Sequence, residues 1–500
     1  MKNCALSVLF SLVSLLVFSG CGSTVVNSHL QKAPMMEQYM AGQNPAVTQL
    51  IEKKLDKNSW RNVINTGDEI MWRLEAGSMY FHIGNYKECI EQLKIAEELI
   101  RSYDERALLS IRDAGSETGA ALANMNVLPY RGYCRDRILL SFFKSLAYLG
   151  AGNESAFRAQ LRRLRDEHKK VLEDYQKFFD AEKEEVDKSK AKNAEAVKKR
   201  NPDISPEALA QDSRNAVWAG ELNHITQRAH KGYGNFLNPA TIFLSGLGSV
   251  FDNNYENARI DFQRLYDAMP QNPMARKYYV SVLKKAGRPV PAVLKGEKAF
   301  DFSLDKNCVY VIFANGRSAA FRQISIYYPI MTAWPVMEFY PSAFNRIKIT
   351  ADAGTYCSFP LADMDGIMAQ EFKGRLPGII TRVILSTTIK EVAYHAALAA
   401  ARQITDSTAR AIAMVAVSSA GTAYRIATNT ADTRSWEILP KEFQLTQFPM
   451  PRNRTLSITL EGAVPRTESL RIPDGVKSAI IYVSAVNGNN IKYHLLPLGN

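Results

Sequence analysis

The sequence feature that most restricts the fold is a helical spacing of apolar and small residues within residues 70–100. Such residues recur there every three and four positions, which places them on one face of an α-helix. The Gly84-Asn85 pair interrupts the spacing where a turn would join two helices. The segment therefore predicts a helical hairpin. The positions that carry the pattern are Leu74, Gly77, Tyr80, Tyr86, Cys89, Leu93, Ala96 and Leu99.

This spacing resembles the tetratricopeptide repeat, a helix–turn–helix unit of about 34 residues. A second copy lies in residues 140–164, where Tyr148 and Gly152 stand 68 positions after Tyr80 and Gly84. That distance is twice the repeat length. The two copies therefore predict a stack of helical hairpins.

A third copy lies in residues 240–270, with Tyr255 and Ala258 at signature positions. A helix over residues 274–286 would cap it. The stretch from Ile111 to Gly132 does not match the repeat. Three repeats are about the minimum for a stable stack. We therefore expect a tetratricopeptide-like α-helical solenoid, and the alternative is an unrelated helical bundle.

Charge and proline divide the rest of the chain. Residues 160–200 mix acidic and basic side chains around a thin apolar stripe, which is typical of a long solvated helix. The Pro-rich run from Gly287 to Pro291 marks a domain boundary. We expect a helical domain over residues 45–288 and a second domain over residues 296–500.

The second domain has the composition of a β-rich, sandwich-like fold with a helical insertion near residues 363–430. The Asn315-Gly316 pair predicts a β-hairpin between strands over residues 309–314 and 318–328. The predicted fold class is therefore α+β. Further strands are expected over residues 335–340, 345–350, 355–359, 456–460, 468–472, 479–486 and 491–496.

The helical insertion is rich in alanine and predicts a hairpin that turns near Thr405-Asp406-Ser407. Such a hairpin either contacts a membrane or a partner, or lies buried on the sheet. Five basic residues argue against insertion into hydrocarbon. We therefore expect a buried hairpin. The five are Arg382, Lys390, Arg402, Arg410 and Arg425.

The N-terminus has the features of a bacterial lipoprotein signal. A basic start precedes 14 apolar residues and serines from Ala5 to Phe18, too few for a membrane span. The next residues, Ser19-Gly20-Cys21, resemble a lipobox, although Phe18 replaces the usual leucine. We expect a signal peptide over residues 1–20 and lipidation of Cys21. The alternative is an ordinary secretory signal with a chance cysteine.

A lipidated Cys21 would tether the body through a polar, flexible linker over residues 21–44. Gly22, in place of aspartate, favours the outer membrane. No other stretch approaches the length of about 18 uncharged apolar residues that a span requires, so no transmembrane helix is expected. These features predict a cell-envelope protein, an outer-membrane lipoprotein that faces the periplasm.

Four cysteines remain in the body after Cys4 and Cys21 are set aside. An oxidising compartment permits disulfides, with one pair in each half of the chain. The spacing fixes no connectivity, and four unpaired buried thiols are the open alternative. The four are Cys89, Cys134, Cys308 and Cys357.

The chain carries no recognisable catalytic or metal-binding motif. It has no His-Glu-x-x-His, no phosphate loop and no nucleophile elbow, and its seven histidines are scattered. Its net charge of +12 comes without the interleaved basic and aromatic stripes typical of nucleic-acid binding. We expect no enzymatic activity, no cofactor, no metal, and neither nucleotide nor nucleic acid as a ligand.

Three further motifs accompany the lipobox. They are Asn238-Pro239 with Leu244-Ser245-Gly246-Leu247 and Asn257-Ala258-Arg259, Phe313-Ala314-Asn315-Gly316, and the run from Ala431 to Pro440. Together they resemble a family of uncharacterised bacterial lipoproteins with an N-terminal tetratricopeptide-like region and a C-terminal β-rich domain. The resemblance implies an envelope protein and supplies no catalytic residues. Its most specific positions either mark a site or, as we expect, make structural contacts: Asp432, Arg434, Trp436 and Pro440.

These observations favour a lipid-anchored, non-enzymatic scaffold for protein–protein interaction. The repeats would offer a concave groove to an envelope protein. One alternative is an envelope enzyme acting on polysaccharide or peptidoglycan, with its site in the β-rich domain. Another is a subunit of an export or polymer-secretion assembly.

Overall fold

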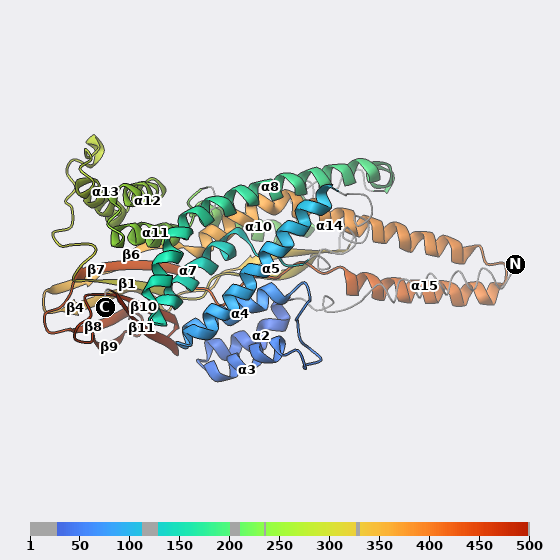
Figure 1. Cartoon of the computed structure of the whole chain (residues 1–500). Coiled ribbons are helices and arrows are strands. Elements are labelled where there is room, and N and C mark those ends of the chain that lie inside the picture. Colours follow the sequence, from blue (N-terminus) through green and yellow to red (C-terminus); the bar gives the residue numbers. More distant parts are fainter. Residues whose placement is uncertain (1–27, 113–128, 201–210, 235–236, 327–330, 499–500) are drawn as a thin grey trace.

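The computed structural model describes residues 28–112, 129–200, 211–234, 237–326 and 331–498. The predicted signal peptide and Cys21 lie outside these residues. Within them, helices fill the first half, and three sheets with a long helical hairpin fill the second half (Figure 1). The α+β fold class predicted from the sequence is confirmed.

Two helices of the first half, α11 (Pro239–Phe251) and α13 (Pro273–Lys285), begin at an asparagine cap followed by proline. Asn238 and Asn272 each accept backbone N–H bonds with their side chains, and Pro239 and Pro273 follow them at the first helical position. The helices of the first half are α2 (Ser28–Met40), α3 (Asn44–Leu55), α4 (Glu69–His82), α5 (Tyr86–Arg112), α7 (Cys134–Gly150), α8 (Glu154–Arg200), α10 (Ala216–Ala229), α11 (Pro239–Phe251), α12 (Tyr255–Ala268) and α13 (Pro273–Lys285).

Three helical hairpins, α4–α5, α7–α8 and α11–α12, share one turn geometry. In each turn a residue with positive φ ends the first helix: Gly84 (80°), Gly152 (74°) and Asn253 (56°). The next residue donates its N–H to the carbonyl five positions earlier, as in a Schellman motif. The bonds are Asn85 to Tyr80 (2.9 Å), Asn153 to Tyr148 (2.9 Å) and Asn254 to Ser249 (2.8 Å).

The hairpins pack in chain order, with α5 against α7, α8 against α11 and α13 after α12. Close packing depends on small residues. A side chain at Gly77 would place its Cβ 2.4 Å from Leu93 Cδ2, and one at Gly246 would approach Phe262 to 3.0 Å. The first two copies are neighbours in space, since α5 of the first packs against α7 of the second. Helix α5 is long and continues to Arg112. The described residues hold no further helical hairpin between the two copies, although their spacing would leave room for one.

The strands form two main sheets and a ribbon. The five-stranded sheet has the order β11-β10-β1-β7-β6, the four-stranded sheet has the order β5-β4-β8-β9, and β2 pairs with β3 alone. The strands are β1 (Cys308–Asn315), β2 (Ala320–Ile326), β3 (Thr332–Glu338), β4 (Phe344–Ala351), β5 (Gly354–Cys357), β6 (Phe359–Asp363), β7 (Glu442–Pro449), β8 (Thr455–Gly462), β9 (Arg466–Arg471), β10 (Ser478–Asn487) and β11 (Asn490–Leu498).

The β-hairpin predicted at Asn315-Gly316 is wrong. Strand β1 is buried along its whole length and pairs in parallel with β10 and antiparallel with β7, so both its edges are occupied. Gly316 donates its N–H to the carbonyl of Ala485 (2.8 Å), and the chain then leaves the sheet. Strand β2 pairs with β3 in a separate ribbon.

Two apolar cores lie on opposite faces of the five-stranded sheet. On one face, residues such as Val311 and Ile481 pack against Ile347 and Ile458 of the four-stranded sheet, which gives the predicted sandwich. On the other face, the sheet joins one continuous core with the helical array. The helices, the five-stranded sheet and the four-stranded sheet therefore form three layers.

The prediction of a flexible linker is wrong from Ser28 onward. Residues Ser28–Met40 form α2, and α3 follows after a short turn at Gly42. Both helices contribute to the main core, through Met35 and Met36 in α2 and other residues in α3. The polar composition of this stretch suggested an exposed linker, but α2 buries two of its polar side chains, Ser28 and Lys32.

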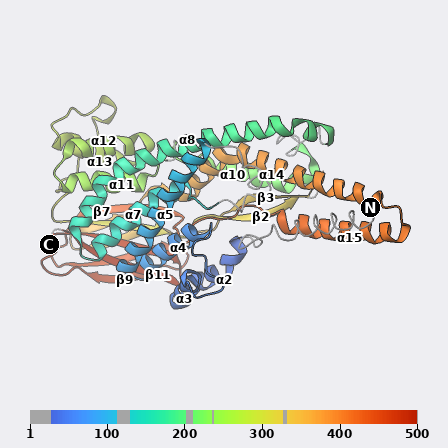
Figure 2. The same cartoon turned by 45° about the vertical axis from the view of Figure 1, so that its right-hand side comes forward.

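The helical insertion forms α14 (Met364–Arg402) and α15 (Ser407–Thr428). The first part of α14 packs against α10 and β3 in a separate apolar cluster. Beyond it, the two helices project away from the sheets as an antiparallel pair (Figure 1, Figure 2). We call residues 391–424 the arm. The prediction of a hairpin buried on the sheet is wrong for the arm.

All four cysteines of the body are free thiols. Burial raises the pKa of Cys308 to about 11 and raises the pKa of Cys89 and Cys134 further. The structure therefore follows the unpaired alternative.

Candidate functional site

The concave face of the helical array is the first region that the sequence marks as a candidate site. Its inner helices are α4, α7 and α11, and each presents a phenylalanine to the five-stranded sheet. The chain's own sheet therefore covers the face on which a tetratricopeptide array offers its groove. The ring pairs are Phe81–Tyr482 (centroids 5.0 Å apart), Phe142–Phe443 (5.1 Å) and Phe243–Tyr310 (6.2 Å).

The repeat-signature residues occupy turns and packing positions. Tyr80 is 7% exposed and donates its hydroxyl to Glu52 Oε1 (3.1 Å). Tyr86 packs its ring where a side chain at Gly150 would stand, and its hydroxyl lies 2.9 Å from His494 Nδ1. The others lie in turns or against neighbouring helices: Gly77, Gly84, Cys89, Ala96, Tyr148, Gly152, Tyr255 and Ala258.

The second candidate is the run from Ala431 to Pro440, which lies within residues 429–441, the link from α15 to β7. We call these residues the clamp segment, because they lie extended across α2 and α4. Trp436 is fully buried and donates its indole N–H to Ser78 Oγ (3.0 Å). Leu439 and Pro440 line the small cavity described below.

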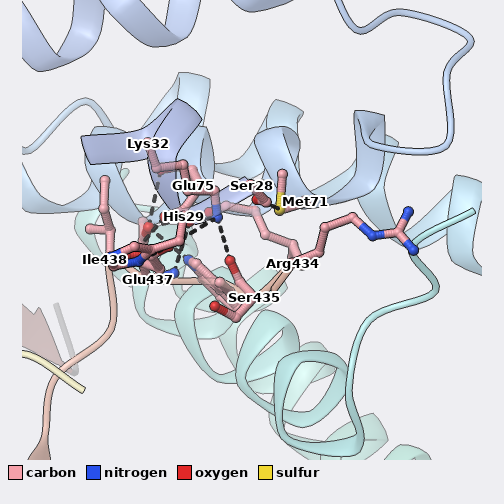
Figure 3. Close-up of polar contacts among 12 residues, drawn as sticks. Ser28, His29, Lys32, Met71, Glu75, Arg434, Ser435, Glu437 and Ile438 are labelled. Carbon is pink, nitrogen blue, oxygen red and sulfur yellow. Dashed lines mark hydrogen bonds and ion pairs between the residues drawn. The ribbon is translucent and has the colours of Figure 1, made fainter. Parts of the chain in front are cut away.

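Four charged side chains are buried together at the clamp segment, and Figure 3 shows three of them, Lys32, Glu75 and Glu437. Lys32 Nζ lies 2.6 Å from Glu75 Oε1 and donates a further bond to the carbonyl of Ser435. Arg317 Nη2 lies 2.7 Å from Glu437 Oε2. Lys32, Glu75, Arg317 and Glu437 form the buried charge cluster, in which two cations balance two anions.

Backbone contacts fix this arrangement. The Glu75 carboxylate accepts the N–H groups of Glu437 (2.8 Å) and Ile438 (2.9 Å), in addition to the Lys32 ammonium. Burial raises the pKa of Glu75, and Lys32 opposes that shift. One carboxylate thus joins α2, α4 and the clamp segment, so its loss would leave two N–H groups without this acceptor and remove the nearest ion-pair partner of a buried ammonium.

A second ion-pair group flanks the cluster. Arg434 lies 2.8 Å from Asp432 Oδ2 and 3.3 Å from Asp68 Oδ1 at the start of α4. Burial alone would lower the pKa of Arg434, but Asp432 and Asp68 raise it. Burial raises the pKa of Asp68 despite Arg434. Asp432, Arg434 and Trp436 thus all make contacts within the body of the molecule.

A serine, a histidine and an asparagine meet where α4 contacts β10 and β11. His82 Nδ1 lies 3.1 Å from Ser484 Oγ, and Nε2 lies 2.8 Å from Asn490 Oδ1. Burial lowers the pKa of His82 to about 4, so the ring is neutral. The adjoining cavity has a volume of about 20 Å³, which accommodates about one water molecule. The group therefore links helix to sheet and has no room for a substrate.

The arm is the third candidate, and it exposes apolar surface. Its own core consists of Leu398, Ala401, Ala413 and Val417. On the opposite face of α15, Ile412 and Val415 are 65% and 67% exposed. A helix that is apolar on all sides is normally buried. The arm therefore resembles part of a larger helical bundle.

The described residues contain no group of three or more His, Cys, Asp or Glu side chains arranged to hold a metal ion. The two sheets of the sandwich enclose an apolar cluster that includes Val311, Phe313, Ile347 and Ile458. None of the described helices is both long enough and apolar enough to cross a bilayer.

Sequence reasoning missed the buried charge cluster completely. Lys32 lies in a stretch of linker-like composition, and no spacing relates it to Glu75 or Glu437. The one available signal is Glu75 itself, an acid at a core-facing position of a helix whose neighbours are otherwise apolar. Such an acid requires a buried cation.

Comparisons with protein-family models, with curated proteins and with solved structures find no match to this chain.

Proposed function

We propose that this chain is a lipid-anchored, non-enzymatic scaffold of the bacterial cell envelope, held through Cys21, and that it binds an envelope protein through the arm. The observation that carries the proposal is the exposed apolar face of the arm. The proposal moves the interaction surface from the concave face of the repeats, which the sheet covers, to the helical insertion.

The composition of the arm supports helix–helix contact. Residues 391–424 contain 12 alanines and four charged residues. Exposed alanines recur on α14 at Ala393, Ala396 and Ala400. Small residues allow helices to approach closely. The exposed alanine face of α14 has few of the large side chains that anchor a helix in lipid. A helix-bearing protein therefore fits the arm better than a bilayer does.

The root of the arm supports a presenting role. Trp218 and Trp334 pack against each other there with centroids 4.9 Å apart, in the cluster that buries the first part of α14. Below the arm, the clamp segment ties the chain to α2 and α4. A firmly rooted projection presents its outer face with little loss of conformational freedom on binding.

The test is affinity purification of the tagged, lipidated protein from crosslinked envelopes, with partners identified by mass spectrometry. The double variant Ile412→Glu/Val415→Glu places two carboxylates on the exposed face of α15. Val464→Glu is the matched control, because Val464 is 65% exposed in the turn between β8 and β9. We expect stoichiometric partners with the native chain and the control, and their loss with the double variant.

Unchanged recovery of partners with the double variant would refute the arm as the binding surface. Absence of any partner above background would refute the scaffold itself. Intact mass of the purified chain tests the anchor separately, because a lipidated Cys21 adds the mass of its acyl groups.

A further inference from the structure

The structure points to a second contact with the membrane: we propose that residues 50–61, at the end of α3 and in the loop after it, bind the surface of an anionic phospholipid bilayer. We call these residues the basic loop. The inference goes beyond the scaffold role and rests on the proposed lipid anchor for its placement.

The first observation is Trp60. Its exposed fraction is 82%, whereas the other four tryptophans of the chain are at most 2% exposed. Indole rings favour the membrane–water interface, where the ring contacts acyl chains and the N–H stays hydrated. Arg61 lies over the Trp60 ring at 4.2 Å from its centroid, so a cation accompanies the exposed indole.

The second observation is the charge around Trp60. Lys53, Lys57 and Arg61 are exposed, and Leu50 shares the outer face of α3 with Lys53. Two acids of the segment are also exposed: Glu52, which accepts the Tyr80 hydroxyl (3.1 Å), and Asp56, which accepts the N–H of Asn58 (2.9 Å). Against the four cations Lys53, Lys54, Lys57 and Arg61 they leave the basic loop with a net charge of +2. The surface therefore presents lysine, arginine and an apolar group together, which matches phosphate headgroups above acyl chains.

The third observation is the position of the basic loop relative to the anchor. Lys54 Nζ lies 5.3 Å from the centroid of Trp72, and the neighbouring Met71 Sδ lies 3.4 Å from Ser28 Oγ. Ser28 is the first residue of α2. The short stretch of chain that separates it from Cys21 spans at most about 25 Å. A lipid on Cys21 therefore holds this side of the molecule close to the bilayer.

Together these observations select a lipid surface over a protein partner. The acyl groups on Cys21 would hold the chain at the bilayer, and an additional contact through the basic loop would fix its orientation. Trp60 would enter the interface, and Lys53, Lys57 and Arg61 would meet the phosphates. The bilayer would then restrict how the arm is presented.

Trp60 provides its own probe. The lipidated chain is reconstituted in vesicles of brominated phosphatidylcholine with a minor share of phosphatidylglycerol, and tryptophan quenching is compared with that in unbrominated vesicles of the same ratio. The four buried tryptophans are shielded, so quenching reports on Trp60. We expect quenching in the native chain, its loss in Trp60→Phe, and at least a twofold decrease in the Lys53→Gln/Lys57→Gln/Arg61→Gln variant.

Val293→Trp is the matched control, because Val293 is 72% exposed just after the helical array and far in sequence from the anchor. In a Trp60→Phe background it should restore no quenching. Equal quenching of the native chain and Trp60→Phe would overturn the proposal, as would equal quenching in vesicles of phosphatidylcholine alone. If intact mass shows no lipid on Cys21, the anchor fails, and the same chain added to the vesicles still tests the basic loop.

Discussion

The arm and the clamp segment follow each other in the chain, yet they are held in opposite ways. The clamp segment is extended, and its stability comes from other elements: α2, α4 and the loop after β1 supply the charges and hydrogen bonds that fix it. The arm consists of two helices joined by a short turn, and its own apolar cluster is small. The clamp segment, which is not helical, is therefore attached to more of the molecule than the helical arm is.

The difference indicates how the parts are used. A segment whose charged groups pair with three elements can hold one position, because any displacement leaves buried charges unpaired. A helical pair with a small core and an exposed apolar face keeps its shape and still has surface to offer. If the two parts differ in this way, a change in the buried charge cluster should destabilise the rest of the chain and leave the arm unaffected.

The largest expected effect is the loss of Glu75. Glu75→Ala removes the carboxylate that pairs with the buried Lys32 ammonium and accepts two backbone N–H groups, so we expect a loss of about 3–5 kcal/mol in the free energy of unfolding. Urea denaturation followed by circular dichroism measures it. Arg471→Ala is the control: its ion pair with Asp474 is exposed, and the expected change is within about 0.5 kcal/mol. Equal losses in the two variants would show that the cluster does not hold the body.

The second prediction concerns pH. Burial lowers the pKa of His82 and of His494 to about 4, from an ordinary value of 6.5. The unfolded chain therefore takes up protons near pH 6.5 that the folded chain takes up only near pH 4. Their contribution to stability is fully present above pH 6.5 and is lost as the pH falls towards 4.

We expect the share of His82 to be roughly 2 kcal/mol between pH 7.5 and pH 5. His82→Gln lowers stability at pH 7.5 but should give a shallower loss on acidification. Glu75 acts in the opposite direction, since its pKa is raised, so the difference between the two proteins is the quantity to measure. Parallel pH profiles would show that His82 is not held neutral.

Much of the fold could be predicted because its signals are local. The turns at Gly84 and Gly152, the strands of the second half and the helical hairpin at residues 363–430 each depend on short-range spacing and turn chemistry. The Asn315-Gly316 hairpin failed for the opposite reason. Its outcome depended on β10, which lies near the far end of the chain and occupies the edge of β1 that a hairpin partner would need.

The candidate sites were less accessible to sequence reasoning. The concave face of the repeats was expected to be open, but the sheet that covers it belongs to the other half of the chain. The exposure of Ile412 and Val415 could not be read from an alanine-rich pattern, because that pattern fits a buried hairpin equally well. Which surface remains open is decided by tertiary packing.

A third prediction compares glycines of the body and the arm. A Cβ at Gly77 would lie 2.4 Å from Leu93 in the main core, and a Cβ at Gly421 would lie 2.4 Å from Tyr394 in the arm. Leu93 is fully buried and cannot move aside, so Gly77→Ala should cost about 1–3 kcal/mol. Tyr394 is half-buried and can turn away, so Gly421→Ala should change stability by less than about 1 kcal/mol, helped by the better helix propensity of alanine.

Urea denaturation of both variants measures the difference. Gly77→Ala should cost less in a Leu93→Ala background than in the native chain, because the shorter side chain frees the space that the new Cβ needs. A larger loss from Gly421→Ala than from Gly77→Ala would mean that the arm is packed as tightly as the body.

The smallest expected effect is the response of the arm to Glu75→Ala, which we expect to be none. Amide hydrogen exchange in native buffer reports the free energy of each local opening. Amides of α4 should lose protection by the amount that the variant loses in global stability, since they exchange only when the body unfolds. Amides of α15 between Ile412 and Val417 should exchange at the native rate, because the small core of the arm opens at lower cost than the body. If their exchange accelerates in step with α4, the arm and the clamp segment unfold as one unit, and the arm cannot change its packing on a partner while the body stays folded.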